Sequence, residues 1–69
     1  MEASKKLKQA MVELEITQLE LASRTEQTQA NLSYKINSDN FRIYEYRELV
    51  EAMGCKLEFN IILPSGKKL

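Results

Sequence analysis

Histidine and tryptophan are absent from this chain, and its 69 residues include only one cysteine, one proline and two glycines. Without histidine, the common zinc-ligand sets and the histidine-based catalytic triads lack an essential member. Cys55 has no second cysteine to bond, which fits a reducing cytosol. We favour its reading as a small buried hydrophobe over the alternative of a reactive thiol. The sequence accordingly predicts no metal site and no cofactor.

Long apolar runs and net charge are lacking as well. No run approaches the roughly 18 apolar residues that span a bilayer, and the N-terminus has no apolar signal segment, so we expect a cytoplasmic protein and no membrane contact. The chain has 10 basic and 10 acidic side chains. This balance argues against a non-specific polyanion binder but leaves open DNA binding by locally arranged charge. A Gly-rich phosphate loop and a paired carboxylate motif are also missing, so no enzyme is expected.

What the chain does contain is helical spacing over most of its length. The first predicted helix, residues 3–14, has one apolar face made of Leu7, Ala10, Met11 and Leu14. The last predicted helix ends before Gly54, and its apolar positions are Tyr46, Leu49, Val50 and Met53. Between the two, residues 38–40 predict a turn, and Phe41 and Ile43 are expected to plug the core from a loop.

Residues 17–36 predict two further helices, over 18–24 and 29–37, joined by a tight turn. Thr17 and Glu20 have the spacing of a capping box, and Thr28 is a second N-cap candidate. Leu32 and Ile36 share the inner face of the second helix, so its amide-rich N-terminal face is expected to point outward. Two capped helices this close together are typical of a helix-turn-helix unit, whose second helix can enter the DNA major groove.

After Gly54 the apolar spacing changes to alternation, which predicts a β-strand over residues 55–63. Pro64-Ser65-Gly66 predicts a turn, so only residues 67–69 are left to fold back on the strand. We expect a second copy to cover the open edge about a two-fold axis. The rival is a monomeric hairpin that covers only the end of the strand. The predicted homodimer interface consists of Leu57, Phe59, Ile61 and Leu63.

Four segments, in order, resemble the phage repressor and Cro-like (XRE-type) helix-turn-helix family. They are Thr17-Gln18-x-Glu20-Leu21-Ala22, Thr28-Gln29-x-Asn31-Leu32-Ser33, Asn40-Phe41-Arg42-Ile43 and Glu51-Ala52-Met53-Gly54. The resemblance implies a mainly α fold, a compact bundle of four or five helices, here with a C-terminal β-strand added. It also implies operator binding by a dimer, with residues 1–54 as the DNA-binding domain and residues 55–69 as a dimerisation element. The chain departs from the family in having Thr25, Glu26 and Gln27 where apolar residues flank a turn glycine, and Tyr44 where a small capping residue is common.

The resemblance and the helix-turn-helix geometry together assign candidate DNA contacts. Gln29 leads the second helix and has the side chain that binds adenine in a bidentate way. The candidates for base contact are Gln29, Ala30, Ser33 and Tyr34. The candidates for contact with the DNA backbone are Thr17, Gln18, Thr28, Asn31, Lys35 and Arg42. Structural readings compete with these: a solvated Gln29, a Tyr34 that covers the bundle edge, solvated Lys35 and Arg42, and threonines that only cap helices.

The leading hypothesis from the sequence is a homodimeric, sequence-specific regulator of transcription that binds double-stranded DNA. The alternative is a protein-interaction module on the same fold, such as an antitoxin-like partner, with weak or no DNA binding. Zero net charge, Glu26 in the turn and the long apolar strand motivate this alternative.

Overall fold

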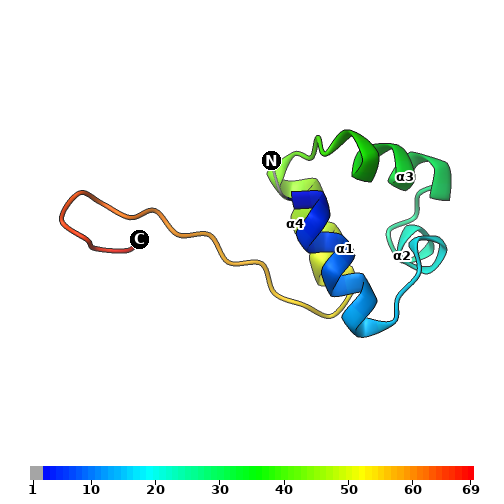
Figure 1. The fold of residues 1–69 in the computed structure, drawn as a ribbon, viewed down its shortest axis with the longest axis horizontal. Coiled ribbons are helices and arrows are strands. Elements are labelled where there is room, and N and C mark those ends of the chain that lie inside the picture. The colour runs from blue at the N-terminus through cyan, green and yellow to red at the C-terminus, as the bar shows by residue number, and fades with distance from the viewer. Residues whose placement is uncertain (1–2) are drawn as a thin grey trace.

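The computed structural model describes residues 3–69, and in that range the chain forms four helices and no β-strand (Figure 1). The helices are α1 (Ala3–Leu14), α2 (Gln18–Arg24), α3 (Gln29–Ser38) and α4 (Ile43–Ala52). The bounds predicted for the first two are confirmed, and the third runs one residue further than predicted. The fold is therefore mainly α. No helix within residues 3–69 is long and apolar enough to cross a membrane.

All four helices contribute side chains to one core. Leu21 and Leu32, from α2 and α3, are both fully buried at 0% exposure. The buried apolar residues are Leu7, Met11, Leu21, Ala22, Leu32, Ile36, Phe41, Leu49, Val50 and Met53. They include most of the positions that helical spacing predicted. Leu14, predicted on the inner face of α1, is 45% exposed because it lies in the last turn, at the end of the bundle.

The two apolar residues that follow α3 behave differently. Phe41 is buried as predicted, and its ring meets that of Tyr46 edge to face, with centroids 5.4 Å apart. The prediction that Ile43 plugs the core from a loop is wrong, because Ile43 is the first residue of α4 and is 64% exposed. Ile43 lines an apolar groove of about 180 Å³ that the single chain leaves open. Its apolar character therefore reflects a surface groove rather than the core.

Three of the helices end with the same hydrogen-bond pattern, the Schellman motif. The residue after the helix cap has a positive φ, which is 56° at Glu15, 55° at Glu26 and 81° at Gly54. After α1, Glu15 N donates to Val12 O and Ile16 N to Met11 O. After α2, Glu26 N donates to Ser23 O and Gln27 N to Ala22 O. After α4, Gly54 N donates to Glu51 O and Cys55 N to Val50 O. Only α4 has glycine at the left-handed position. After α1 and α2, a glutamate adopts a conformation that its Cβ disfavours.

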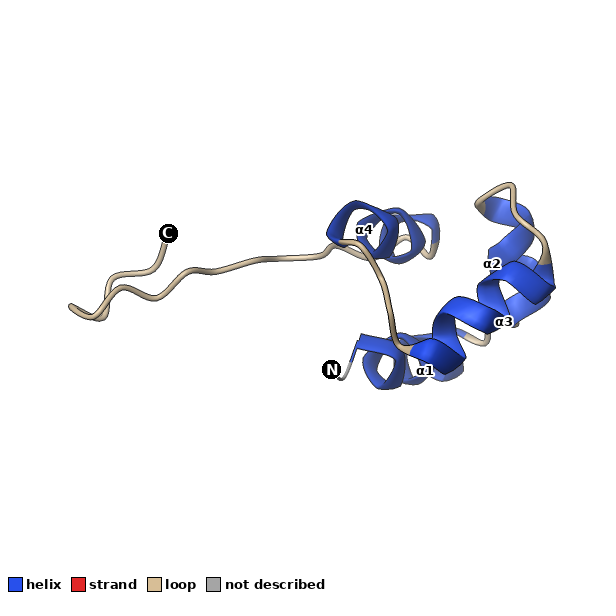
Figure 2. Ribbon diagram, turned by 90° about the horizontal axis from the view of Figure 1, so that it is seen from above, coloured by secondary structure: helices blue, strands red, loops and turns tan. Residues whose placement is uncertain are grey.

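Residues 55–69, the C-terminal arm, extend away from the helices in both views (Figures 1 and 2). The radius of gyration is 13.5 Å, compared with about 11 Å for a compact chain of this length. Cys55 and Leu57 are half-buried against the core. The strand predicted over 55–63 does not form within the single chain. An isolated antiparallel bridge joins Ile62 to Lys68 instead, because residues 67–69 reach back only to Ile61.

The end of the arm is the short hairpin that was predicted as the rival to strand pairing. Leu63 N donates to Lys67 O at 2.8 Å, and Leu69 N donates to Ile61 O at 2.8 Å. Gly66 N closes the predicted turn by donating to Leu63 O, and its φ of 93° is one that glycine adopts without strain. The hairpin leaves the rest of the arm without a neighbouring strand.

Candidate nucleic-acid interface

Two threonine caps position the α2–α3 pair. Thr17 Oγ1 accepts a hydrogen bond from Glu20 N at 3.1 Å, and Thr28 Oγ1 accepts one from Asn31 N at 3.0 Å. Each oxygen satisfies one of the backbone N–H groups that a helix start leaves unpaired. Both predicted caps are therefore confirmed. Capping uses an acceptor position of each hydroxyl oxygen and leaves its proton for another partner.

The outer face of α3 is open to solvent. Leu32 and Ile36, at 0% and 2% exposure, anchor the helix from behind. Among the base-contact candidates, Gln29, Ala30 and Tyr34 are exposed and Ser33 is half-buried. The alternative prediction placed Tyr34 over the edge of the bundle, but Tyr34 is 73% exposed and does not cover that edge. The four candidates thus share one accessible helix face, as their spacing predicted.

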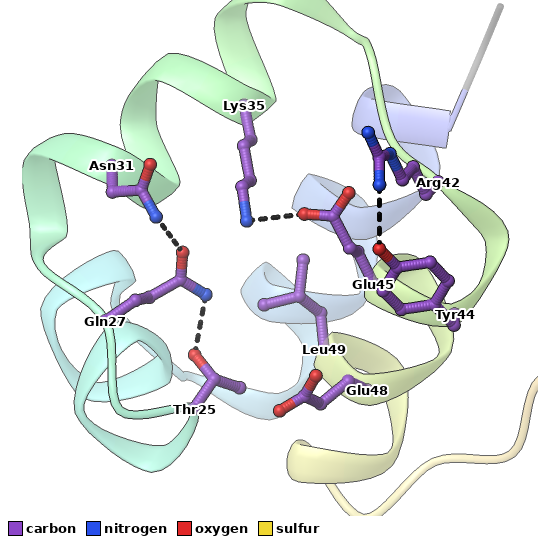
Figure 3. A pocket seen from close by; sticks show the side chains of 9 residues that line it. All are labelled: Thr25, Gln27, Asn31, Lys35, Arg42, Tyr44, Glu45, Glu48 and Leu49. Atoms are coloured by element: carbon purple, nitrogen blue, oxygen red, sulfur yellow. Dashed lines mark hydrogen bonds and ion pairs between the residues drawn. The ribbon is translucent and has the colours of Figure 1, made fainter.

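A chain of side-chain hydrogen bonds closes the turn between α2 and α3 (Figure 3). Asn31 Nδ2 donates to Gln27 Oε1 at 3.0 Å, and Gln27 Nε2 donates to Thr25 Oγ1 at 2.8 Å. Thr25 Oγ1 in turn donates to Leu21 O at 3.0 Å. Asn31, predicted as a DNA-backbone contact, therefore also braces the turn. This role of Thr25 and Gln27 was not predicted, because Gln27 precedes α3 and its bond to Asn31 depends on the shape of the turn.

The two cations predicted to meet phosphates, Lys35 and Arg42, both have partners on α4. Lys35 Nζ lies 2.6 Å from Glu45 Oε2, and the two side chains are only about a quarter exposed. This hydrogen bond from Lys35 holds the pKa of Glu45 below its usual value. Arg42 Nη1 donates to the Tyr44 hydroxyl at 3.0 Å, and this bond raises the pKa of Arg42. The positive charges near α3 are thus partly engaged within the molecule.

These groups line a polar groove of about 470 Å³ between the α2–α3 turn, α3 and α4 (Figure 3). The groove holds both signs of charge: Lys35 faces Glu45 across it, and Arg42 and Glu48 also line it. Its lining residues are Thr25, Gln27, Asn31, Lys35, Arg42, Tyr44, Glu45, Glu48 and Leu49. Over residues 3–69, no cluster of three His, Cys, Asp or Glu side chains is placed to hold a metal ion. The groove offers hydrogen bonds and paired charges to a polar ligand.

The structure brings the predicted contacts together only in part. The base-contact candidates lie on α3, while Thr17 and Gln18 lie at the start of α2. Arg42 stands at the N-cap position of α4 without a side-chain capping bond. Gln18 is half-buried, which limits its reach toward a backbone phosphate. Comparison of the chain with protein-family models, curated proteins and solved structures finds no match.

Proposed function

We propose that this chain is a sequence-specific DNA-binding regulator of transcription of the repressor-like helix-turn-helix type, acting as a homodimer. In this proposal α3 enters the major groove and Gln29, Ala30, Ser33 and Tyr34 meet base edges. The dimer forms through Leu57, Phe59, Ile61 and Leu63 of the arm. Thr17, Gln18, Thr28, Asn31, Lys35 and Arg42 contact the DNA backbone and set the orientation of α3.

The observation that carries the proposal is the exposed, uncharged polar face at the N-terminal end of α3. This end of the helix is the part of a recognition helix that meets bases first. Gln29, Ala30 and Tyr34 are all exposed there, while Leu32 at 0% exposure fixes the helix to the core. A helix of ten residues held from one side and solvated on the other has the size to fit the roughly 12 Å width of the major groove.

The charge pairs on this surface limit how many cations can contact DNA phosphates. Lys35 must exchange Glu45 for a phosphate, or reach one while remaining bound to Glu45 at 2.6 Å. Each phosphate neutralised adds about 0.9 to the slope of log K against log salt. Because few cations surround α3, we expect a shallow salt dependence and an affinity that depends more on base contacts than is usual.

Selection of bound duplexes from a random pool, followed by fluorescence anisotropy on the enriched sequence, tests the proposal. We expect one family of sequences to be enriched, with affinity that falls as salt rises. Gln29→Ala should then weaken binding about 5- to 150-fold, which corresponds to roughly 1–3 kcal/mol for one bidentate base contact. Gln9→Ala is the matched control, because Gln9 is an exposed glutamine on α1. Absence of any enriched sequence, or equal loss in both variants, would contradict the proposal.

A specific observation also favours the second function, a protein-interaction module such as an antitoxin-like partner. Lys35 and Arg42 are engaged with Glu45 and Tyr44, and the arm exposes large apolar side chains such as Ile61 at 65%. In this case a protein partner recovered by pull-down should bind equally well when Gln29 and Lys35 are both replaced by alanine. The same double variant would lose binding to DNA if the first function holds, so one pair of measurements separates the two.

A further inference from the structure

The hairpin at the end of the arm uses only one edge of residues 56–63. On that edge, Leu69 N donates to Ile61 O and Leu63 N donates to Lys67 O, both at 2.8 Å. In an extended segment, the backbone polar groups of successive residues point to opposite edges. The even-numbered residues therefore present their N–H and C=O groups to the other edge: Lys56, Glu58, Asn60 and Ile62. Within residues 3–69, no backbone hydrogen bond reaches these groups.

The side chains of this segment also lack cover. Phe59, Ile61 and Ile62 are 49%, 65% and 65% exposed. Phe59 lies under the guanidinium of Arg47, 5.5 Å from the ring centroid, so the inner part of the arm follows α4 while the outer part leaves the body. An isolated two-stranded hairpin is marginally stable in water, and an open apolar edge readily pairs with another strand.

We propose that a second copy of this chain pairs antiparallel with this edge in one register, with Phe59 opposite the partner's Phe59. This register places Lys56 opposite the partner's Ile62 and Glu58 opposite the partner's Asn60, so every even-numbered residue from 56 to 62 forms a hydrogen-bonded pair. A register centred on residue 58 would put two Glu58 carboxylates directly opposite each other, which is unfavourable. A register centred on residue 60 would place Lys56 opposite the partner's Pro64, which has no N–H to donate.

The same register brings apolar side chains of the partner beside the apolar groove next to the arm. Leu57 and Phe59 line this groove, which has a volume of about 180 Å³ and continues over Ile43 and Tyr46. Leu57 stands opposite the partner's Ile61, whose side chain is on the same face of the paired strands. The partner's Ile61 is therefore the neighbour of a side chain that lines the groove.

This inference rests on the homodimer of the proposed function and specifies how the two copies meet. Cysteine cross-linking in the full chain tests it, with Cys55 replaced by serine. Directly opposed residues at a non-hydrogen-bonded site have Cα atoms about 4.5 Å apart, within the range that a disulfide spans. We expect Phe59→Cys to form a covalent dimer under mild oxidation. Leu57→Cys and Ile61→Cys should not do so alone, because equivalent positions are about 13 Å apart in this register, but a mixture of the two should cross-link.

Light scattering on the unmodified chain and circular dichroism of each variant accompany the cross-linking. A dimeric mass, native helix content and the cross-linking pattern above would support the register. A dimer that cross-links best through Leu57→Cys or Ile61→Cys alone would overturn the register and leave the homodimer standing. A monomeric mass, or a monomer that pairs only with a different protein, would overturn both. DNA binding is measured separately, so its loss would count against the proposed function and not against the pairing.

Discussion

Replacing Glu26 with glycine is expected to raise the free energy of unfolding by about 0.5–1 kcal/mol. Glu26 has a φ of 55° in the turn between α2 and α3. The left-handed conformation costs a residue with a Cβ roughly 1–2 kcal/mol. Glycine removes that cost but gains freedom in the unfolded chain, which offsets roughly 0.4–1 kcal/mol. The balance is a modest net stabilisation, because the backbone bonds from Glu26 N to Ser23 O and from Gln27 N to Ala22 O do not involve the side chain.

Urea denaturation followed by circular dichroism measures this change, together with two control variants. Gly54→Ala places a Cβ at φ 81°, where no atom lies within 4 Å, so its expected destabilisation of about 1 kcal/mol is purely conformational. Glu48→Gly removes an exposed glutamate from the interior of α4 and should destabilise by about 0.5–1 kcal/mol. In a domain of this size, the gain in Glu26→Gly corresponds to a rise in Tm of about 2–8 °C.

The sign of the Glu26→Gly change in stability shows whether the backbone at Glu26 is strained. Glycine has the same unfolded-state entropy at positions 26 and 48, so the difference between the two variants isolates the backbone strain at Glu26. If Glu26→Gly destabilised the chain as much as Glu48→Gly does, the left-handed turn would not be strained. The α2–α3 pair would then adopt a different turn in solution from the one described.

Three further outcomes are expected. Leu32→Ala should destabilise the chain by about 2–5 kcal/mol in urea denaturation, because Leu32 is fully buried, and a loss below 1 kcal/mol would contradict its role as the anchor of α3. A hydrogen bond from Ser4 lowers the pKa of Asp39, and one from Lys35 lowers the pKa of Glu45. Each carboxylate therefore stabilises the folded chain above its ordinary pKa, which is 3.8 for Asp39 and 4.5 for Glu45, and this stabilisation is lost as pH falls through the lower pKa of the folded state. Asp39→Asn should flatten the fall in urea midpoint below about pH 4, and an unchanged acid limb would refute this. Glu45→Gln should free Lys35 and steepen the salt dependence of DNA binding by about 0.9, whereas Glu48→Gln, in the same groove, should leave the slope unchanged.

The parts of the fold that follow from neighbouring residues could be predicted from the sequence. The Thr17 and Thr28 caps each bond a backbone N–H three residues ahead, and the spacing of Leu32 and Ile36 alone defines the buried face of α3. In both cases the relevant partners lie within one or two helical turns. The turn between α2 and α3 was predicted less well: the missing glycine favoured a looser or differently shaped turn, yet Glu26 itself takes the left-handed conformation, with a φ of 55°.

Contacts between distant segments could not be predicted in the same way. Glu45 bonds Lys35 only because α4 passes beside α3, and no local pattern marks either residue as one of a pair. Ser4 N donates to Asp39 Oδ1 at 2.9 Å across 35 positions of sequence, which ties the start of α1 to the end of α3. The prediction for Ile43 was wrong for the same reason, because its apolar side chain lines a groove that is formed partly by the distant arm. Helical periodicity cannot distinguish such a groove from a core.

The way α3 is held explains why its surroundings are polar. With only Leu32 and Ile36 buried, ten residues of helix have few apolar contacts to fix their direction. Polar ties supply the rest: at its C-terminal end Ser4 Oγ donates to Ile36 O at 2.6 Å, and at its N-terminal end Asn31 donates to Gln27. Each tie contributes roughly 0.5–1.5 kcal/mol, less than an apolar anchor, and the N-terminal one is exposed. The end of α3 that carries Gln29 is therefore held less firmly than the end that carries Ile36.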